Sequence, residues 1–289
     1  MQLIHLVLLL ALTASCAHAF FLESWSFKNW NDYADDKSDS TAAWREEWSI
    51  NRWSWPRSGG TSYNNHRIVD DPAGGSEKVL QVTYPVGSSN PAGSPQGGIG
   101  FYAQPITLRR EARLVSFEYQ VYFPDSFTFV KGGKLPGLYG GHEGCSGGSD
   151  SESCFSTRFM WRRQGDGEIY AYMPESKQRD TLCDEEGNIC NPNYGYSLGR
   201  GSWRFQKGEW VKIRQTLKLN HPDRLDGMVH VHVNGRLVYS ENQLALVARD
   251  TDKIIGVAFH TFFGGSGIDW APEEEMYTYF KDFTIAAFY

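Results

Sequence analysis

The sequence lacks the features that mark proteins of membranes and nucleic acids. Lys and Arg number 28 and Asp and Glu number 34, so the 289 residues carry a net charge of −6. An acidic chain without a basic stripe does not have the electrostatic footprint of a nucleic-acid-binding protein. The apolar run at 6–12 is much shorter than the roughly 20 residues that cross a bilayer. We therefore expect no nucleic-acid partner and no membrane span.

Cysteine is scarce as well. Five cysteines are present, no pair has the Cys-x-x-Cys spacing, and no Asn-x-Ser/Thr sequence offers a glycosylation site. Without Cys16, which lies in the leader described next, four remain, and an even count in a secreted chain suggests disulfides. Of three possible connectivities, Cys145 with Cys154 and Cys183 with Cys190 are favoured, because each pair closes a short loop. A structural zinc is the rival interpretation. We expect no metal and no cofactor.

Residues 1–19 have the composition of a secretory signal peptide. They contain the apolar run and end in Ala17-His-Ala19, a small-x-small cleavage site before Phe20, although they hold no Lys or Arg. No composition shift or low-complexity linker divides the remainder, whose length fits one large all-β domain. The sequence therefore predicts a signal peptide over 1–19, a single domain over 20–289, and a secreted, extracellular protein. We expect it to be a monomer.

Apolar and polar residues alternate in many segments, which is the pattern of strands with one buried face. The clearest case is 114–123, where every second residue is apolar and faces one way. Asn234-Gly235, between two such runs, is a signal for a two-residue hairpin turn. Further strands are expected at 79–84, 211–219, 229–233, 236–239, 255–259 and 279–285, and a short helix at 39–48. Many strands, regular turns and 30 glycines favour an all-β sandwich of two antiparallel sheets.

The segment Phe155–Met173 is the most informative about function, because it reads as two alternating strands joined by a glycine-containing turn. Ser156 and Arg158 share one face of the first strand, and Tyr170 and Tyr172 share a face of the second. If the turn holds an odd number of residues, paired positions have an even sum, and the two pairs lie side by side. The register stays open, since turns of roughly three or five residues are both plausible.

Such a patch holds a cation, a hydroxyl and two phenols, a set suited to chemistry on an acidic sugar. Arginine offers a planar fork for a carboxylate, and a phenol is a proton carrier whose pKa falls beside cations. β-Elimination in a polyuronate needs a neutralised C5 carboxylate, a base for the C5 proton and an acid for the departing O4. An ordinary solvated sheet face with arginine and tyrosine is the alternative explanation.

Two further motifs resemble those of a known family. They are Val130-Lys-Gly-Gly-Lys-Leu-Pro-Gly-Leu-Tyr-Gly-Gly-His142 and Gly256-Val-Ala-Phe-His-Thr-Phe-Phe-Gly-Gly265, the second followed by Asp269-Trp270. Together with the hairpin they resemble the polysaccharide lyase family 14 alginate lyases, over most of the chain after the leader. The resemblance implies a β-jelly roll with a concave sheet that holds the substrate. It also implies a catalytic set at Lys134, Ser156, Arg158, Tyr170 and Tyr172.

The implied activity is endolytic β-elimination at the 1,4-glycosidic bond of alginate, with poly(β-D-mannuronate) as the expected substrate and 4,5-unsaturated uronate ends as products. Arg158 and His260 are expected to bind and neutralise the carboxylate, and Ser156 to position the sugar. Lys134 is the expected base, because Arg158 and partial desolvation would lower its pKa.

The remaining roles are less narrowly assigned. Tyr170 and Tyr172 would donate to O4 or exchange protons, and either could instead be the base. Lys131 and Asp269 are expected to bind substrate at the rim. Glu168 shares the face of the two tyrosines and is a candidate acid near the turn.

Several alternatives stay open. The chain could be a lyase of another polyuronate, such as glucuronan, or a sugar-binding jelly roll without catalysis, and preference between mannuronate and guluronate is not fixed. His230 and His232 share a strand face, as metal ligands do, but solvated strand histidines are favoured. The tryptophans between Trp25 and Trp55 are expected to pack in the core rather than to stack on sugar rings.

Overall fold

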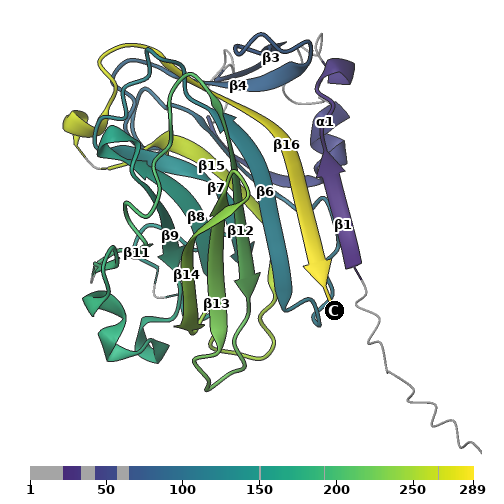
Figure 1. The fold of residues 1–289 in the computed structure, drawn as a ribbon, viewed down its shortest axis with the longest axis vertical. Coiled ribbons are helices and arrows are strands. Elements are labelled where there is room, and N and C mark those ends of the chain that lie inside the picture. The colour runs from purple at the N-terminus through teal and green to yellow at the C-terminus, as the bar shows by residue number, and fades with distance from the viewer. Residues whose placement is uncertain (1–21, 34–42, 57–64, 150, 192, 266) are drawn as a thin grey trace, which may run out of the picture.

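The computed structural model describes residues 22–33, 43–56, 65–149, 151–191, 193–265 and 267–289. Over these residues the chain forms two antiparallel sheets of eight strands each, which pack face to face (Figure 1). The signal peptide predicted over 1–19 lies outside the described residues. No described helix is both long enough and apolar enough to cross a bilayer.

Sheet A is ordered β14-β13-β12-β6-β16-β4-β3, with β1 also paired to β16. Its strands are β1 (Leu22–Phe27), β3 (His66–Asp70), β4 (Lys78–Tyr84), β6 (Leu114–Tyr122), β12 (Trp210–Lys218), β13 (Gly227–Val233), β14 (Arg236–Leu244) and β16 (Met276–Phe288). The one α-helix within the described ranges, α1 (Ala43–Glu47), lies beside β1 in Figure 1.

Sheet B is ordered β10-β11-β9-β8-β7-β15-β5-β2. Its strands are β2 (Ile50–Trp55), β5 (Ile99–Ala103), β7 (Gly132–Gly140), β8 (Phe155–Arg162), β9 (Gly167–Tyr172), β10 (Ile189–Cys190), β11 (Tyr196–Leu198) and β15 (Ile254–Phe263). Short 3-10 helices occur at Asn31–Tyr33, Arg163–Gly165, Glu175–Lys177, Asp180–Asp184 and Ile268–Trp270.

The chain passes repeatedly from one sheet to the other, between β1 and β2, β2 and β3, β4 and β5, β5 and β6, β6 and β7, β11 and β12, β14 and β15, and β15 and β16. Strands that are neighbours in a sheet are therefore often far apart in sequence, as β6 is from its neighbours β12 and β16. This topology is that of the predicted jelly roll, in which both sheets contribute one face to a shared core.

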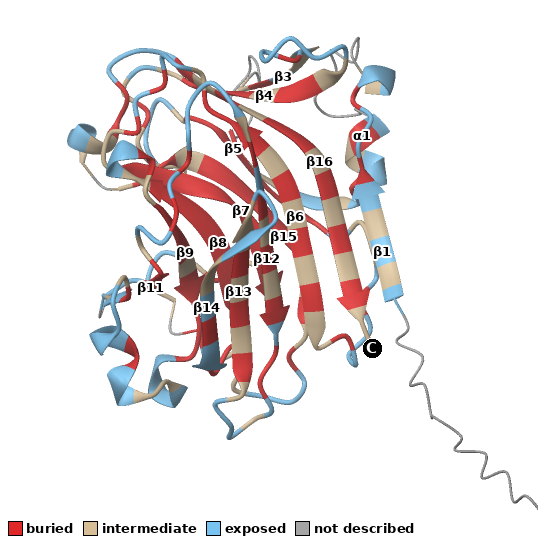
Figure 2. Ribbon diagram, in the orientation of Figure 1, coloured by how far each residue is buried: buried red, intermediate tan, exposed pale blue. Residues whose placement is uncertain are grey.

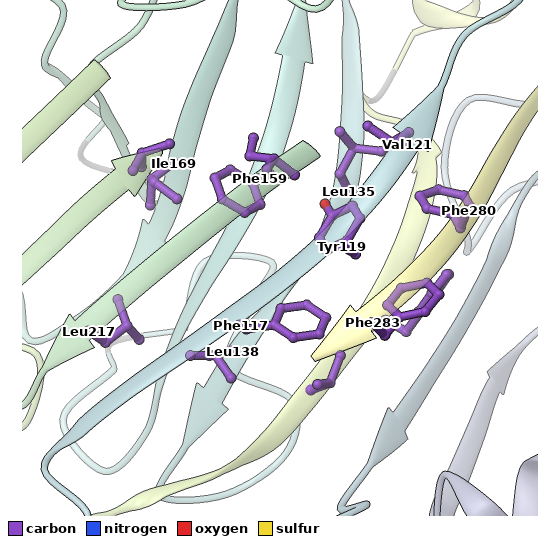
Figure 3. Packing of buried hydrophobic residues seen from close by; sticks show 14 of the residues in the cluster. Phe117, Tyr119, Val121, Leu135, Leu138, Phe159, Ile169, Leu217, Phe280 and Phe283 are labelled. Atoms are coloured by element: carbon purple, nitrogen blue, oxygen red, sulfur yellow. The ribbon is translucent and has the colours of Figure 1, made fainter. Parts of the chain in front are cut away.

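The core fills the space between the sheets. In β6 the residues Val115, Phe117, Tyr119 and Val121 have no solvent exposure, and the residues between them are half-buried. Figure 3 shows Phe117, Tyr119 and Val121 in one cluster with labelled side chains of β7, β8, β9, β12 and β16. Figure 2 shows the same alternation as bands along β6 and β16, whereas β7 and β8 are buried along almost their whole length. Burial of each such apolar side chain contributes about 1.5–3 kcal/mol, so the alternation fixes which face of β6 and β16 points inward.

β7 breaks the alternation at Pro136. Leu135 pairs with Phe159 and Gly137 pairs with Arg158, so Pro136 is an extra residue that bulges out of the ladder. A bulge is a position where proline is tolerated, because no ladder hydrogen bond is needed there. The carbonyl of Pro136 accepts a hydrogen bond of 3.1 Å from the phenol of Tyr119 on the opposite sheet. This contact satisfies a buried hydroxyl and anchors the bulge.

The sequence-based strand predictions are confirmed in type, with ends that shift by a few residues. Asn234 and Gly235 have φ values of 49° and 82° and join the paired residues Val233 and Arg236, as a two-residue primed turn does. The helix expected at 39–48 is α1 over 43–47, and 39–42 lie outside the described residues. Trp30, Trp44 and Trp48 are at most 2% exposed, which confirms core packing for these three.

Candidate active site

The β8–β9 hairpin has the even-sum register predicted for a turn of odd length. Ser156 pairs with Tyr172 and Arg158 pairs with Tyr170, so the four side chains lie side by side on the outer face of sheet B. The turn holds three residues, 163–165, closed by a 2.7 Å hydrogen bond from the Arg162 amide to the carbonyl of Asp166. The intervening residues Thr157, Phe159 and Ile169 point into the core and fix the face on which the polar set stands.

Lys134 reaches the same face from β7, where it pairs with Met160 of β8. The Pro136 bulge lets Lys134 and Tyr139, an odd number of residues apart, share the outer face. Gly137 permits the close approach of β7 and β8 just after the bulge. A Cβ atom there would lie 2.1 Å from the carbonyl oxygen of Thr157 and 2.5 Å from Cα of Arg158. The Gly-Gly-Lys-Leu-Pro-Gly motif therefore builds the local backbone that presents the lysine.

His260 comes from β15 on the other side of β7. Its ring lies 4.8 Å from the ring of Trp55 and 4.8 Å from that of Tyr102, measured between centroids. Trp55 reaches His260 across Gly100, where a Cβ atom would come within 2.1 Å of the indole ring. The imidazole is thus clamped between two aromatic rings.

These groups are recessed although they stand on the face turned away from the core. Lys134 is 8% exposed, His260 4%, and Ser156 and Arg158 3% each. Polar side chains so deeply buried are normally satisfied by partners. The Nε2 atom of His260 and the Nε atom of Arg158 nevertheless have no hydrogen-bond partner among the described residues. Two buried donors converge on this face without an acceptor.

Arg158 and His260 form a direct pair. The guanidinium donates from Nη1 to Nδ1 of His260 over 3.2 Å, since arginine has no acceptor atom. Nδ1 is therefore the unprotonated nitrogen, and the ring proton is on Nε2. Burial lowers the pKa of His260 well below its ordinary value, and the nearby Arg158 and Arg52 lower it further. The imidazole is neutral beside a fixed cation, so the pair offers N–H donors suited to a carboxylate.

The Lys134 amine is in an environment that disfavours its charge. Burial lowers the pKa of Lys134 well below its ordinary value, and Arg158 and Arg162 add to the effect. Nζ lies 3.0 Å from the thioether sulfur of Met160 and 3.1 Å from the ring centroid of Tyr170. A thioether and an aromatic face solvate an ammonium poorly compared with water. The lowered pKa expected from the sequence is confirmed in direction.

Tyr170 differs from the expectation that the pKa of a phenol falls beside cations. Burial raises the pKa of Tyr170 to about 12, and Tyr172 adds to this, while Arg162 opposes it only in part. Tyr170 is therefore suited to hold a proton rather than to lose one in the resting site. Tyr172 is 4% exposed and its oxygen accepts a 3.0 Å hydrogen bond from the amide of Gly147.

Ser156 has a partner that the sequence does not indicate. Its hydroxyl donates to the carbonyl of Cys145 over 2.8 Å, in the loop between β7 and β8. Both predicted disulfides, Cys145–Cys154 and Cys183–Cys190, are present, so the rival zinc interpretation is wrong. In the described part of the chain, no group of three or more His, Cys, Asp or Glu is placed to hold a metal ion. His230 instead contacts Asn242 on sheet A, 3.0 Å away.

Glu168 lies on the face of the tyrosines, as predicted, but it is fully buried and forms ion pairs with Arg162 and Arg200. Its carboxylate accepts hydrogen bonds from Arg162 at 2.9 Å, from Arg200 at 2.6 Å and from the Ser197 hydroxyl at 3.1 Å. A carboxylate held by two guanidiniums is poorly placed to act as an acid. The cluster leaves one net positive charge next to Tyr170, over whose ring Arg162 lies at 5.7 Å.

Lys131 and Asp269 lie apart from this group. They form an ion pair with each other, and Nζ of Lys131 is 5.9 Å from the ring centroid of Trp270. Among the described residues, no hydrogen bond, ion pair or ring contact joins this pair to the five predicted catalytic residues. Sequence reasoning missed Trp55 and Tyr102 as neighbours of His260, and Met160 as the neighbour of Lys134. Only Met160 carried a signal, because it shares the alternation of Ser156 and Arg158.

Comparisons with known proteins show the family and agree with the fold. Residues 72–283 match the model of the family described as polysaccharide lyase 14. The crystal structure of the marine PL-14 alginate lyase from Aplysia kurodai has 33% sequence identity, covering 90% of this chain and 97% of that chain, with a TM-score of 0.76. The alginate lyase vAL-1 from Chlorella virus has 23% identity, covering 84% and 93%, with a TM-score of 0.69. No curated protein sequence matches the chain.

A third structure with the same fold is a doubly substituted variant of the alginate lyase Aly36B in complex with an alginate tetrasaccharide. It has 22% identity, covering 91% of this chain and 96% of that chain, with a TM-score of 0.68. The jelly roll is the fold of the polysaccharide lyases that the chain resembles. The extent of the family match and the likeness to the Aplysia enzyme also show which family of these lyases the chain belongs to. The chain belongs to the polysaccharide lyase 14 family.

Proposed function

We propose that the protein is a secreted, endolytic alginate lyase that cleaves the 1,4-glycosidic bond by β-elimination, with poly(β-D-mannuronate) as the preferred substrate. The observation that carries the proposal is the convergence of Arg158, His260 and Lys134 on one recessed face, with two phenols beside them. The cationic groups on this face suit a polyanion although the whole chain is acidic, because attraction depends on the local field.

The first requirement of the reaction is a neutralised carboxylate at C5. Arg158 would place its guanidinium against one carboxylate oxygen, and Nε2–H of His260 would donate to the other. Both donors are buried and held by their own contact, so little reorganisation is needed when charge builds up on the carboxylate. The clamp lowers the pKa of the C5 proton by stabilising the developing enolate.

The second requirement is the movement of one proton in and one proton out. The neutral amine of Lys134 would take the C5 proton, and the C5–H electron pair would form the C4–C5 double bond. The C4–O4 bond then breaks, and a phenol delivers its proton to the departing O4. Tyr172 is our choice for this acid, and Tyr170 is the alternative. If Lys134 is not the base, one of the two tyrosines would take the C5 proton instead.

The leader and the two disulfides support secretion, because disulfides persist in oxidising compartments. Endolytic cleavage is tested by comparing the fall in viscosity of the polymer with the release of unsaturated ends. A fast fall at few cleavages supports it, and slow fall with early release of short products opposes it. Sedimentation of the purified protein tests the expected monomer.

The decisive experiment is an ultraviolet assay for the unsaturated uronate. Purified protein is mixed separately with polymannuronate, polyguluronate and glucuronan. A rise in absorbance with polymannuronate supports the proposal, and a larger rise with another polymer reassigns the substrate. Binding of polymannuronate without any rise on the three polymers would leave a sugar-binding jelly roll as the better description.

A further inference from the structure

Three hydroxyl groups of the site are bonded to the backbone of a single loop. We call residues 144–149 and 151–154 the disulfide loop, because Cys145 and Cys154 join its two ends. The amide of Gly144 donates to the phenol of Tyr102 over 2.9 Å, and the amide of Gly147 donates to the phenol of Tyr172 over 3.0 Å. The carbonyl of Cys145 accepts the 2.8 Å hydrogen bond from Ser156.

These partners lie on three strands of sheet B that are not all neighbours. Tyr102 is on β5, Ser156 on β8 and Tyr172 on β9, with β15 and β7 between the first and the second. The loop therefore lies over the outer face of the sheet. It also helps to explain why the polar groups there are buried. An ion pair of 3.5 Å between Glu143, just before the loop, and Arg52 of β2 extends the attachment to the edge strand.

The disulfide is part of this contact and not a remote staple. Cys145 and Cys154 are 3% and 4% exposed and pack with Tyr172 in one apolar cluster. Gly147 has a φ of 66°, in the left-handed region, which turns its amide toward Tyr172. Between the two cysteines, the disulfide loop holds several small residues, among them Gly147, Gly148, Ser149 and Ser151. The disulfide adds a covalent closure to the hydrogen bonds within the loop and so limits its conformations further.

We propose that the Cys145–Cys154 disulfide is a positioning element of the elimination reaction, holding the Gly147 amide on the phenol oxygen of Tyr172. This inference rests on the proposed lyase function. An amide that donates to one side of a phenol oxygen leaves the O–H of the phenol to point elsewhere, here toward the sugar. It also stabilises the phenolate formed when Tyr172 gives its proton to O4. The disulfide itself takes no part in bond making.

Loss of the disulfide should therefore lower kcat more than it raises KM. Binding depends mainly on Arg158 and His260, whose hydrogen bond with each other does not involve the loop. Tyr102 beside His260 is bonded to the loop only through Gly144, which precedes the first cysteine, and Ser156 is bonded to the carbonyl of Cys145. Proton delivery depends on the direction of the Tyr172 hydroxyl, and a misplacement of about 1 Å can cost on the order of 100-fold in rate. We expect kcat of Cys145→Ser/Cys154→Ser to fall about 10- to 100-fold, with KM changed by less than about 3-fold.

The second disulfide supplies a matched control. Cys183 and Cys190 also have a Cα–Cα distance of 5.7 Å, and the two bridges have sequence separations of 9 and 7. Cys183→Ser/Cys190→Ser thus removes a bridge of similar size. Among the described residues no hydrogen bond joins this bridge to Tyr170 or Tyr172, from which β11 separates it in the sheet. We expect its kcat to stay within about 2-fold of the wild type, although its stability falls as well.

The experiment measures kcat, KM and the pH profile on polymannuronate for wild type and both double variants. Tyr172→Phe, alone and combined with each pair, completes a double-mutant cycle. The proposal predicts that removing Cys145–Cys154 costs rate in the Tyr172 background and little in the Phe background. An equal loss in both backgrounds, an equal loss with both bridges, or a change in KM alone would overturn it.

Two further measurements keep the outcome decisive. If Cys145→Ser/Cys154→Ser does not fold, the folded wild type is reduced instead. Alkylation and mass spectrometry then identify which bridge has opened at each loss of rate. The wild-type rate in the same assay reports on the lyase function itself. No turnover by the wild type refutes the proposed function, whereas turnover that is insensitive to the bridge refutes only the positioning role.

Discussion

Replacing Lys134 by arginine distinguishes two hypotheses about the role of Lys134, charge neutralisation and proton abstraction. Replacement by alanine would not distinguish them, because it removes the charge and the amine together. Arginine keeps the positive charge but stays protonated at all usable pH values, so it cannot take a proton. If Lys134 only neutralises the substrate, Lys134→Arg should retain most of the activity. If its neutral amine is the base, Lys134→Arg and the uncharged Lys134→Met should fail alike.

The surroundings of Lys134 favour the hypothesis that its neutral amine is the base. Nζ is beside a thioether and an aromatic face, and burial lowers the pKa of Lys134 well below its ordinary value. A positioned general base contributes about 100- to 10,000-fold to the rate, which is about 3–5 kcal/mol of the activation barrier. We expect kcat of both variants to fall by a factor in this range.

The assay is the initial rate of ultraviolet absorbance on polymannuronate. Lys131→Arg and Lys131→Met are matched controls, because Lys131 is three residues upstream, 30% exposed and paired with Asp269. Their rates should change only a few-fold. Retention of more than about a tenth of the wild-type kcat by Lys134→Arg would contradict the assignment and make one of the tyrosines the base.

Three other substitutions test the surrounding geometry. Arg158→Lys loses the planar fork of the guanidinium and its hydrogen bond to His260. A charge-assisted hydrogen bond contributes about 1.5–3 kcal/mol, so kcat/KM should fall about 10- to 100-fold. Unchanged kinetics would refute the carboxylate clamp. Gly100→Ala puts a Cβ atom 2.1 Å from the Trp55 ring, so that ring should leave His260 and unfolding stability should fall by about 1–3 kcal/mol. Its control is Gly93→Ala, where the nearest atom is 3.4 Å away, and an equal Tm for both would contradict the clash. Glu168→Gln leaves two guanidiniums facing a neutral group that is fully buried, so denaturant unfolding should show a loss of about 3–5 kcal/mol; an unchanged midpoint would show that the cluster is not held by charge.

Lys134 also makes stability depend on pH. Its pKa in the folded state is lowered, so between that value and the ordinary lysine pKa the unfolded chain binds more protons than the folded one. The stability of the wild type, measured relative to Lys134→Met, should therefore rise with pH across this interval. Above the ordinary lysine pKa the stability difference between the two proteins should no longer change with pH. Parallel stability curves of the two proteins from neutral to alkaline pH would refute the burial argument.

Local pattern was enough to predict the hairpin and the face that its polar residues share. Alternation in 155–173 put Ser156 and Arg158 on one face with Tyr170 and Tyr172 for a turn of odd length, because a strand side chain can point to only two faces. The pairing of Ser156 with Tyr172 and of Arg158 with Tyr170 was left open, since it depends on the length of the turn. The same reasoning predicted most other strands. It also predicted the lowered pKa of Lys134, since a lysine next to Arg158 on a covered face loses hydration.

The parts that could not be predicted depend on contacts between distant segments. The Pro136 bulge moves Tyr139 to the face of Lys134, and nothing in local alternation marks the extra residue until its partners on β8 are known. The clamp of Trp55 and Tyr102 on His260 joins β2, β5 and β15. The pKa of Tyr170 was expected to fall and instead rises to about 12, because burial by the surrounding fold outweighs the nearby cations.

The pleat of β8 and β9 has a consequence for how such a protein can change its substrate. Every residue that points to the outer face is separated from the next by one that points to the core, so the two sets are interleaved but physically distinct. Positions 156, 158, 170 and 172 can be exchanged together while 157, 159, 169 and 171 keep the sandwich intact and Glu168 keeps its ion pairs with Arg162 and Arg200. A library confined to the first set would explore new acidic polymers at little cost in folding, whereas a library over consecutive residues would lose most of its members to unfolding.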